Sequence, residues 1–273
     1  MRAAVLGRPV GHSLSPVLHT AAYEALGLTD WTYTAIDCGE DELAGRLAGL
    51  GPDWAGLSLT MPLKRVGLAL ADDVDPLAAA VGAANTLVLG ARRVAHNTDV
   101  AGIAAALREA GVTAPGSAVL LGAGGTAQAA LAALATLGVR EPVVLVRDPG
   151  RAGPLRDTAA RLGLAVDLRA GLPGPIPDAD LVVSTLPAGA ADGLTPPGTA
   201  VLDVIYAPWP TRFAAAAAGR GATVVGGLAM LLHQAAAQVE LMTGRAAPVE
   251  AMRAALAAAV RAGTEKPAGP PAS

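Results

Sequence analysis

Short apolar runs alternate with longer alanine-rich segments of helical period along almost the whole chain. The short runs predict β-strands, and the longer segments predict the helices that connect them. Strands are expected over residues 3–6, 31–37, 55–59, 117–121, 142–146, 180–184, 200–204 and 222–225. A repeated strand–helix order of this kind is typical of an α/β fold built on parallel sheets.

Turn and cap signals predict where the helices begin and end. Ser15 and Pro16 suit the N-cap and the first position of one helix, and Gly27 suits its far end. Other helices are expected over residues 40–50, from 99 to about 110, and over 228–243 and 248–262. A hairpin formed by residues 87–89 and 94–96 interrupts the pattern midway along the chain.

The chain divides near residue 99, where a helix leads from the hairpin to a second strand–helix series that begins at Ser117. We therefore expect two α/β domains with a cleft between them. The first comprises residues 1–99 and is completed by the C-terminal helices within 233–262, and the second comprises residues 100–232. The tail over residues 263–273 is rich in proline and glycine, which predicts disorder.

Composition narrows the classes of function. The chain is 52% hydrophobic, yet it contains one Phe, three Tyr and three Trp, so the core must consist mainly of Ala, Val and Leu. A net charge of -3 offers no basic field for nucleic acid, and the lone Cys38 excludes an intrachain disulfide. No apolar run approaches the length of a membrane span, and the run before Gly7 is too short for a signal peptide. A cytoplasmic protein with a small-molecule partner, and no nucleic-acid or membrane partner, is expected.

A glycine-rich turn follows the predicted strand over residues 118–121. Its pattern is Gly122-x-Gly124-x-x-Ala127, and an alanine-rich helix follows directly. The first glycine permits a tight turn, the second lets the backbone approach a pyrophosphate, and the small third residue permits close helix packing. The pattern alone arises by chance in a chain of this composition, but the order strand, turn, helix favours a dinucleotide site over a plain loop.

Two arginines follow the next predicted strand. Arg147 ends it, and Arg151 lies four residues on. An arginine at this place pairs with the 2′-phosphate of NADP, whereas an acidic residue would bind the ribose hydroxyls of NAD. Alternatively, both are surface residues, and Asp148 beside them could neutralise Arg147.

Lys64 and Asp99 are candidates for proton transfer. Lys64 closely follows the strand over residues 55–59, and Asp99 is expected to end another strand. Ligands of α/β proteins bind at the carboxyl ends of strands, so the two side chains are expected to meet there. With a dinucleotide nearby, the pair indicates a dehydrogenase acting on a hydroxyl group. The alternative is that Lys64 is an ordinary solvated helix residue.

Hydroxyl groups upstream suggest a site for an anion. Ser13 and Ser15 precede a predicted helix N-terminus, which favours a carboxylate or phosphate, although Ser15 could serve only as the N-cap. His12 and His19 flank this loop and are expected to be structural. No spacing of His, Cys, Asp or Glu suggests a metal site.

Taken in order, these motifs resemble the shikimate dehydrogenase family across nearly the whole chain. The matching segments are residues 7–16, 60–64, 85–86, 97–99, 122–127, 203–206 and 227–234. The resemblance implies reversible, NADPH-dependent reduction of 3-dehydroshikimate to shikimate, a step toward chorismate and the aromatic amino acids. It also implies substrate binding on the first domain and NADP binding on a Rossmann-like second domain. A monomer and a homodimer both remain open.

By the same resemblance, individual residues acquire expected roles. Lys64 would be the acid–base group, with Asp99 beside it also touching the substrate. Substrate would further contact Ser13 and Ser15 through its carboxylate, and Thr60, Asn85, Tyr206 and Gln234 through its other oxygens. The cofactor would contact Gly122, Ala123, Gly124, Gly125, Thr126, Arg147, Arg151, Val204 and Gly227.

Three positions depart from the family pattern. Ser58 stands where many members carry Asn, which shortens a possible substrate contact. Val146 replaces the usual Asn before Arg147, and Asp148 replaces a Thr. The last two leave open a quinate/shikimate dehydrogenase that prefers NAD. An alternative from another class of function is a non-catalytic, nucleotide-binding regulator with the same fold.

Overall fold

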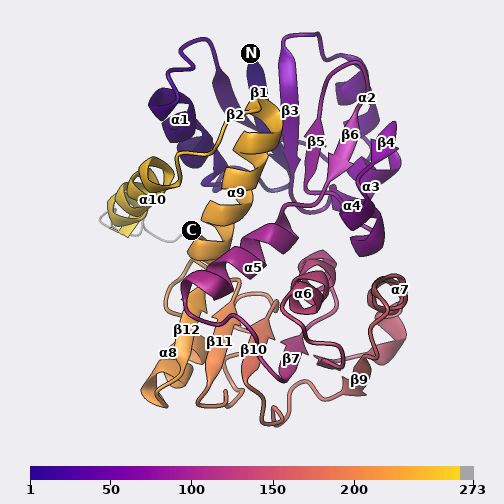
Figure 1. Cartoon of the computed structure of the whole chain (residues 1–273), viewed down its shortest axis with the longest axis vertical. Helices are drawn as coiled ribbons and strands as arrows, with labels where there is room; N and C mark the ends of the chain where they lie inside the picture. Colours follow the sequence, from indigo (N-terminus) through magenta and orange to yellow (C-terminus); the bar gives the residue numbers. More distant parts are fainter. Residues whose placement is uncertain (265–273) are drawn as a thin grey trace, which may run out of the picture.

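Residues 1–264, which the computed structural model describes, form two six-stranded sheets joined by helices (Figure 1). The first sheet contains, from edge to edge, β2 (Thr32–Asp37), β1 (Arg2–Gly7), β3 (Trp54–Leu59), β5 (Thr86–Val88), β6 (Val94–His96) and β4 (Asp73–Val74). Strand β1 pairs in parallel with β2 and β3, whereas β5 pairs antiparallel with both β3 and β6. The predicted hairpin is therefore part of this sheet.

Helices cover both faces of the first sheet. One face packs against α1 (Ser15–Ala25) and the returning helices α9 (Gly227–Thr243) and α10 (Val249–Thr264). The other face packs against α2 (Leu43–Ala48) and the turn before α3 (Lys64–Ala69). Alternate residues of β1 face the two cores, with Val5 toward α9 and Leu6 toward α2. A short helix, α4 (Pro76–Val81), follows the edge strand β4.

The second sheet is entirely parallel. Its order is β12 (Thr223–Gly226), β11 (Ala200–Asp203), β10 (Leu181–Ser184), β7 (Ala118–Leu121), β8 (Val143–Val146) and β9 (Asp167–Ala170). The chain runs from β7 to one edge and then returns to fill the other side. The order reverses beside β7, and ligands of such sheets bind outside the strand ends at this reversal.

The core of the second half is built from small aliphatic side chains, as the composition predicts. Helix α6 (Gly125–Thr136) buries Ala127, Ala129, Ala130 and Ala133 completely in a core that it shares with the sheet and with neighbouring helices. Helix α7 (Gly153–Leu162) lies beside α6, while α8 (Arg212–Gly219) covers the opposite face with Phe213. Alanine lets α6 lie close to the strands, which brings its N-terminus to the end of β7.

Two helices link the halves. Helix α5 (Asp99–Glu109) leads from the first sheet toward the second, and α9 leads back (Figure 1). They cross in close contact at Gly102, where a Cβ atom would lie 2.8 Å from both the Met230 carbonyl oxygen and the Gln234 Cβ. Because only glycine fits at this crossing, the start of α5 and the middle of α9 come together between the halves.

The α/β fold with two sheet-based halves is as expected, and its details correct several predictions. Ser15 is not the N-cap of α1: that position is Leu14, and Ser15 is the first helical residue. Asp99 does not end a strand, because β6 ends at His96 and Asp99 begins α5. The helix expected over 40–50 is shorter, and the strand expected over 31–37 begins at Thr32.

Short elements were not predicted at all, among them α3, α4, α7, α8, β4 and β9. The predicted tail begins at residue 263, but α10 continues to Thr264, and the rest of that prediction lies outside the described residues. Within residues 1–264, no helix has the length and apolar character needed to cross a membrane.

Candidate active site

A cavity of about 310 Å³ lies between the two halves. The first half contributes residues from the loop before α1, from the end of β3 and from α3 and α5. The second half contributes Thr126 and Tyr206, and α9 contributes its buried face. Every residue expected to contact substrate lines this cavity, namely Ser13, Ser15, Thr60, Lys64, Asn85, Asp99, Tyr206 and Gln234.

Lys64 and Asp99 form an ion pair on the cavity wall, with Lys64 Nζ 2.5 Å from Asp99 Oδ2. Their side chains are 19% and 7% exposed, so the pair is only partly open to water. Lys64 is the first residue of α3, and Asp99 is the first residue of α5. The Asp99 carboxylate therefore lies at the positive N-terminal end of α5.

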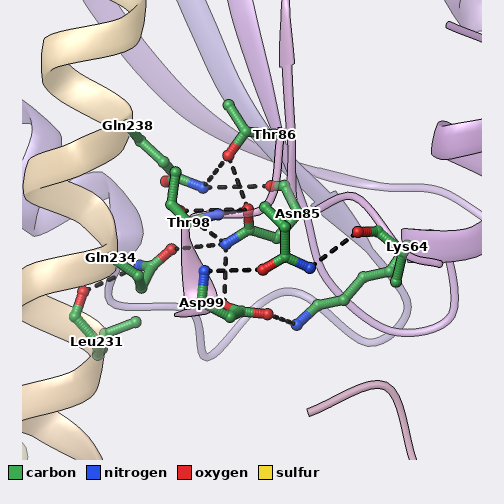
Figure 2. Close-up of polar contacts among 10 residues, drawn as sticks. Lys64, Asn85, Thr86, Thr98, Asp99, Leu231, Gln234 and Gln238 are labelled. Atoms are coloured by element: carbon green, nitrogen blue, oxygen red, sulfur yellow. Dashed lines mark hydrogen bonds and ion pairs between the residues drawn. The ribbon is translucent and has the colours of Figure 1, made fainter. Parts of the chain in front are cut away.

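The Asn85 side chain holds the second oxygen of Asp99 (Figure 2). Its amide nitrogen donates to Asp99 Oδ1 at 2.9 Å and to Gln234 Oε1 at 3.3 Å. Its amide oxygen accepts the Thr98 backbone N–H at 2.7 Å. Both carboxylate oxygens of Asp99 are therefore engaged, one by Lys64 and one by Asn85, which fixes the plane of the carboxylate at the cavity.

Hydroxyl groups line the rest of the cavity. Ser13 Oγ accepts the Ser15 backbone N–H at 3.3 Å, which folds the serine loop over the start of α1. Thr60 follows β3, and its N–H is bound to the Leu6 carbonyl at 2.9 Å. Burial raises the pKa of the Tyr206 hydroxyl, so this group stays protonated at neutral pH.

A buried carboxylate holds the loop that carries Val204 and Tyr206. Asp203, at the end of β11, accepts the Ile205 N–H at 3.2 Å and the Thr211 hydroxyl at 2.7 Å. Burial raises the pKa of Asp203, and these two donors act against that rise. The clasp fixes both ends of the loop at the carboxyl edge of the second sheet.

Four further polar residues lie in or behind the cavity wall, and the sequence analysis considered only Ser58 among them, as a shortened substrate contact. They are Tyr33, Ser58, Thr86 and Gln238, and all are buried. Ser58 and Thr86 are register partners in the pairing of β3 with β5, which places them side by side. A signal existed for Gln238, because it lies four residues after Gln234 on an otherwise apolar helix and therefore on the same face.

His19 is structural, as expected. It is fully buried, and its ring stacks on Tyr33 with centroids 3.9 Å apart. Its Nε2 lies 3.2 Å from Gln238 Oε1. Burial lowers the pKa of His19 to about 4, so the ring is neutral at physiological pH. His12, in contrast, lies exposed at the cavity.

A second cavity of about 460 Å³ opens at the glycine-rich turn. Gly122 has φ +107°, and a Cβ there would lie 2.6 Å from Thr185 Oγ1. No atom lies within 4 Å of a Cβ added at Gly124 or Gly125, which leaves the first turn of α6 open. Residues expected to hold cofactor and found here are Gly122, Ala123, Gly124, Gly125, Thr126, Arg147 and Arg151.

The two cavities adjoin, since Thr126 lines both. Val204 and Gly227, also expected to contact cofactor, line the first cavity rather than the second. A Cβ at Gly227 would lie 2.1 Å from the Val204 carbonyl oxygen, so α9 begins directly on the β11 loop. These two residues therefore contribute to the wall of the first cavity, and Thr126 is the residue that lines both.

Asp148 stabilises the turn that follows β8. Its carboxylate accepts the Gly150 N–H at 2.8 Å and caps the short 3₁₀ helix over Pro149–Arg151. Among residues 1–264 the ion pairs do not include one between Asp148 and Arg147. Arg147 and Arg151 are both exposed at the rim of the second cavity, where their guanidinium groups can meet a phosphate.

A parallel sheet with a dinucleotide turn, facing a second α/β unit across a cavity with a lysine–aspartate pair, defines a two-domain, dinucleotide-binding dehydrogenase. Two family models agree with this class. The model of the shikimate dehydrogenase substrate binding domain matches residues 5–87, and that of the shikimate 5'-dehydrogenase C-terminal domain matches residues 227–257. The chain belongs to the shikimate dehydrogenase family.

Individual relatives are similar over nearly their full length. A shikimate dehydrogenase (NADP(+)) from Moorella thermoacetica is 41% identical, over 97% of this chain and 95% of the relative. The crystal structure of Mycobacterium tuberculosis shikimate dehydrogenase is 47% identical with a TM-score of 0.85, over 94% of this chain and 99% of that one. The crystal structure of shikimate 5-dehydrogenase from Thermus thermophilus, in complex with NADP(H) and shikimate, is 35% identical with a TM-score of 0.81. The match covers 95% of this chain and 99% of that one.

Proposed function

We propose that this chain catalyses the reversible, NADP-dependent interconversion of 3-dehydroshikimate and shikimate, a step toward chorismate and the aromatic amino acids. The observation that carries the proposal is the Lys64–Asp99 pair, which lies in a cavity shared by the two halves and adjoining the dinucleotide turn. Membership of a family whose relatives are named for NADP and shikimate supports both ligands.

Lys64 is proposed to move the proton. In the reducing direction its ammonium group gives a proton to the substrate oxygen, and in the oxidising direction the neutral amine takes it back. NADPH, when bound, supplies the hydride to the carbonyl carbon. Asp99 holds Lys64 in place, since opposite charges about 4 Å apart at intermediate dielectric attract by about 4 kcal/mol before desolvation. Acid–base help of this kind accelerates reactions by about 10²–10⁴-fold.

The other polar groups of the cavity are proposed to bind the substrate. Ser13 and Ser15 would take the carboxylate, because their hydroxyls lie at the positive N-terminal end of α1. The remaining substrate oxygens would contact Thr60, Asn85, Asp99, Tyr206 and Gln234, which line the same cavity. The cavity of about 310 Å³ suits a small polyol acid.

The second cavity suits NADP. The open backbone from Gly122 to Thr126 would cradle the pyrophosphate at the start of α6, and Arg147 with Arg151 would bind the 2′-phosphate. Val204 and Gly227, which line the first cavity, would contact the nicotinamide end.

The domain division and the setting of the enzyme belong to this proposal. Residues 1–99 with the helices within 233–262 would form the substrate-binding domain, and residues 100–232 the NADP-binding domain. The sheets support this division, since the first ends with β6 and the second begins with β7. A cytoplasmic location and a monomeric or homodimeric state are proposed on the same family grounds.

A spectrophotometric assay tests the proposal. Reduction of NADP⁺ and of NAD⁺ is followed by absorbance with shikimate and then with quinate. Fast NADP⁺ reduction with shikimate supports the proposed activity. Preference for quinate with NAD⁺ would favour the catabolic alternative, and no reduction with either acid would favour a nucleotide-binding regulator. The paired Lys64 and Asp99 argue against the regulator, which would not need them.

A further inference from the structure

Gln238 is the centre of a buried polar chain in the wall of the substrate cavity. It lies on α9, is 1% exposed, and uses its amide in four hydrogen bonds. The oxygen is bound to Ser58 Oγ at 2.8 Å and His19 Nε2 at 3.2 Å. The nitrogen is bound to Thr86 Oγ1 at 2.9 Å and to the Asn85 backbone oxygen at 3.2 Å. The amide therefore has no unused polar group to offer a ligand.

A backbone carbonyl sets the direction of this amide. The Asn85 carbonyl oxygen can only accept, so the nitrogen of Gln238 must face it and the oxygen must face the other way. Ser58 and His19 then have to donate to that oxygen. For His19 this selects the tautomer with the proton on Nε2, which agrees with its neutral state.

Ser58 is oriented in consequence. A serine hydroxyl has one proton and two lone pairs, and the proton is committed to Gln238. One lone pair accepts the Tyr33 hydroxyl at 2.6 Å. The second lone pair is left for the cavity, which Ser58 lines. At this point the cavity wall accepts a hydrogen bond and cannot donate one, so it selects a substrate hydroxyl over a carboxylate or carbonyl oxygen.

The chain also continues toward the acid–base pair (Figure 2). The second proton on the Gln238 nitrogen goes to Thr86 Oγ1, so Thr86 directs its own proton to Asn85 Oδ1 at 2.9 Å. With its oxygen held by Thr86 and by the Thr98 N–H, the Asn85 amide must turn its nitrogen toward Asp99 Oδ1. Thr86 is fully buried and does not line the cavity.

We propose that Gln238 is a positioning residue and Ser58 a specificity-determining residue for the reaction proposed above, on which this inference rests. Gln238 turns the Ser58 lone pair toward the substrate, and through Thr86 it holds the Asn85 amino group on Asp99. One backbone carbonyl thereby sets the donor direction at Ser58, and through Thr86 it reinforces the Asn85 orientation that the Thr98 N–H also favours.

Loss of these buried hydrogen bonds changes the acid–base pair as well as the packing. The Asn85 amino group is bound to Asp99 Oδ1, and Asp99 Oδ2 is bound to Lys64 Nζ. If the Asn85 amide loses its orientation, Asp99 and Lys64 are no longer held in the same place, and the pH midpoint of kcat/KM should move. A merely structural defect would lower the amount of active enzyme without moving that pH.

The first test compares Thr86→Val with Thr86→Ser in shikimate oxidation across pH. Thr86→Val keeps the shape but removes the hydroxyl, and we expect kcat to fall by about 10- to 100-fold, as for an unsatisfied buried group. The pH midpoint of kcat/KM should shift, and Thr86→Ser should restore both. Thr158→Val is the matched control, since Thr158 is equally buried but lies in the other half. A normal pH midpoint in Thr86→Val would overturn the inference.

The second test uses Gln238→Glu and Ser58→Ala. An ionised carboxylate at 238 cannot donate to the Asn85 carbonyl, so kcat/KM should decline as pH rises and the introduced group ionises, unlike in the wild type. Ser58→Ala should raise the KM for shikimate about tenfold with the Kd of NADP unchanged. If both variants kept the pH profile and the KM of the wild type, the inference would be refuted. Activity of the wild type with shikimate would still support the proposed function. A wild type inactive with shikimate would instead refute the function itself.

Discussion

The two adjoining cavities are built in opposite ways. The substrate cavity is lined by buried side chains that bind one another and come from both sheets and from α9. The dinucleotide cavity is lined by glycine backbone and by exposed arginines, mostly from two stretches of the chain. The first depends on long-range packing and the second on local backbone geometry. Changes in the first should therefore alter turnover and stability, and changes in the second should alter cofactor binding alone.

The largest effect is expected at Lys64. Lys64→Ala removes the proposed proton donor and should lower kcat for shikimate oxidation by about 10²–10⁴-fold. The fold should persist, because Lys64 is partly exposed and α3 is held by its apolar residues. Stopped-flow or steady-state rates measure the loss, and circular dichroism checks the fold. Near-normal turnover would remove Lys64 from the mechanism.

The next effect concerns stability in acid. The pKa of His19 is lowered by burial from 6.5 to about 4, so the unfolded chain binds the proton more readily between these values. Stability is therefore full above pH 6.5 and declines as pH falls toward 4, by about 3 kcal/mol from this group. Urea unfolding at a series of pH values should give His19→Gln a shallower decline than the wild type. Parallel curves would mean that His19 does not titrate as its burial indicates.

Arg147→Ala should separate the two cofactors. Loss of a charge-assisted hydrogen bond to the 2′-phosphate should raise the KM for NADP⁺ by about 10- to 100-fold and leave that for NAD⁺ nearly unchanged. Arg156→Ala is the matched control, because Arg156 is exposed on α7 away from the cavity. Equal effects on both nucleotides would show that Arg147 does not contact the 2′-phosphate.

The smallest effect is expected at Gly124. The free protein has room for a Cβ there, so Gly124→Ala should leave the melting temperature unchanged. It should still weaken NADP binding about tenfold, because the added methyl group keeps the pyrophosphate from the backbone. Gly153→Ala, at another uncrowded glycine outside the cavity, is the control. Unchanged affinity would mean that the dinucleotide does not approach α6 this closely.

The sequence predicted best the elements that have a clear local motif or a long run of periodic apolar residues. The strands around the glycine-rich turn and the helices α9 and α10 have strong patterns, and their positions are confirmed within a few residues. The short helices α3 and α4 were missed because six residues hold too few periodic positions to distinguish a helix from a loop. Ser15 was given the N-cap because residue type alone does not reveal that Leu14 adopts that position.

In the candidate site too, residues in local motifs were predicted and residues that meet only through the fold were not. Lys64 and Asp99 were expected to meet, and they do, although Asp99 begins a helix rather than ending a strand. The chain through Tyr33, Ser58 and Gln238 was not predicted, because these residues lie 25 and 180 positions apart and meet only through sheet register and helix return. A buried serine in an apolar strand has no local pattern that reveals its partner.

Helix α9 carries a constraint on how the two halves could be recombined. It starts at Gly227 against the Val204 loop and presents Gln234 and Gln238 to the cavity further along one face. Gln234 lies seven positions after Gly227, which is about 10 Å of helix, and one inserted residue would rotate both glutamines by about 100°. In a chimera with the nucleotide-binding half of another dehydrogenase, the junction should therefore lie before Gly227. Helix α9 should then be kept whole, without inserted or deleted residues.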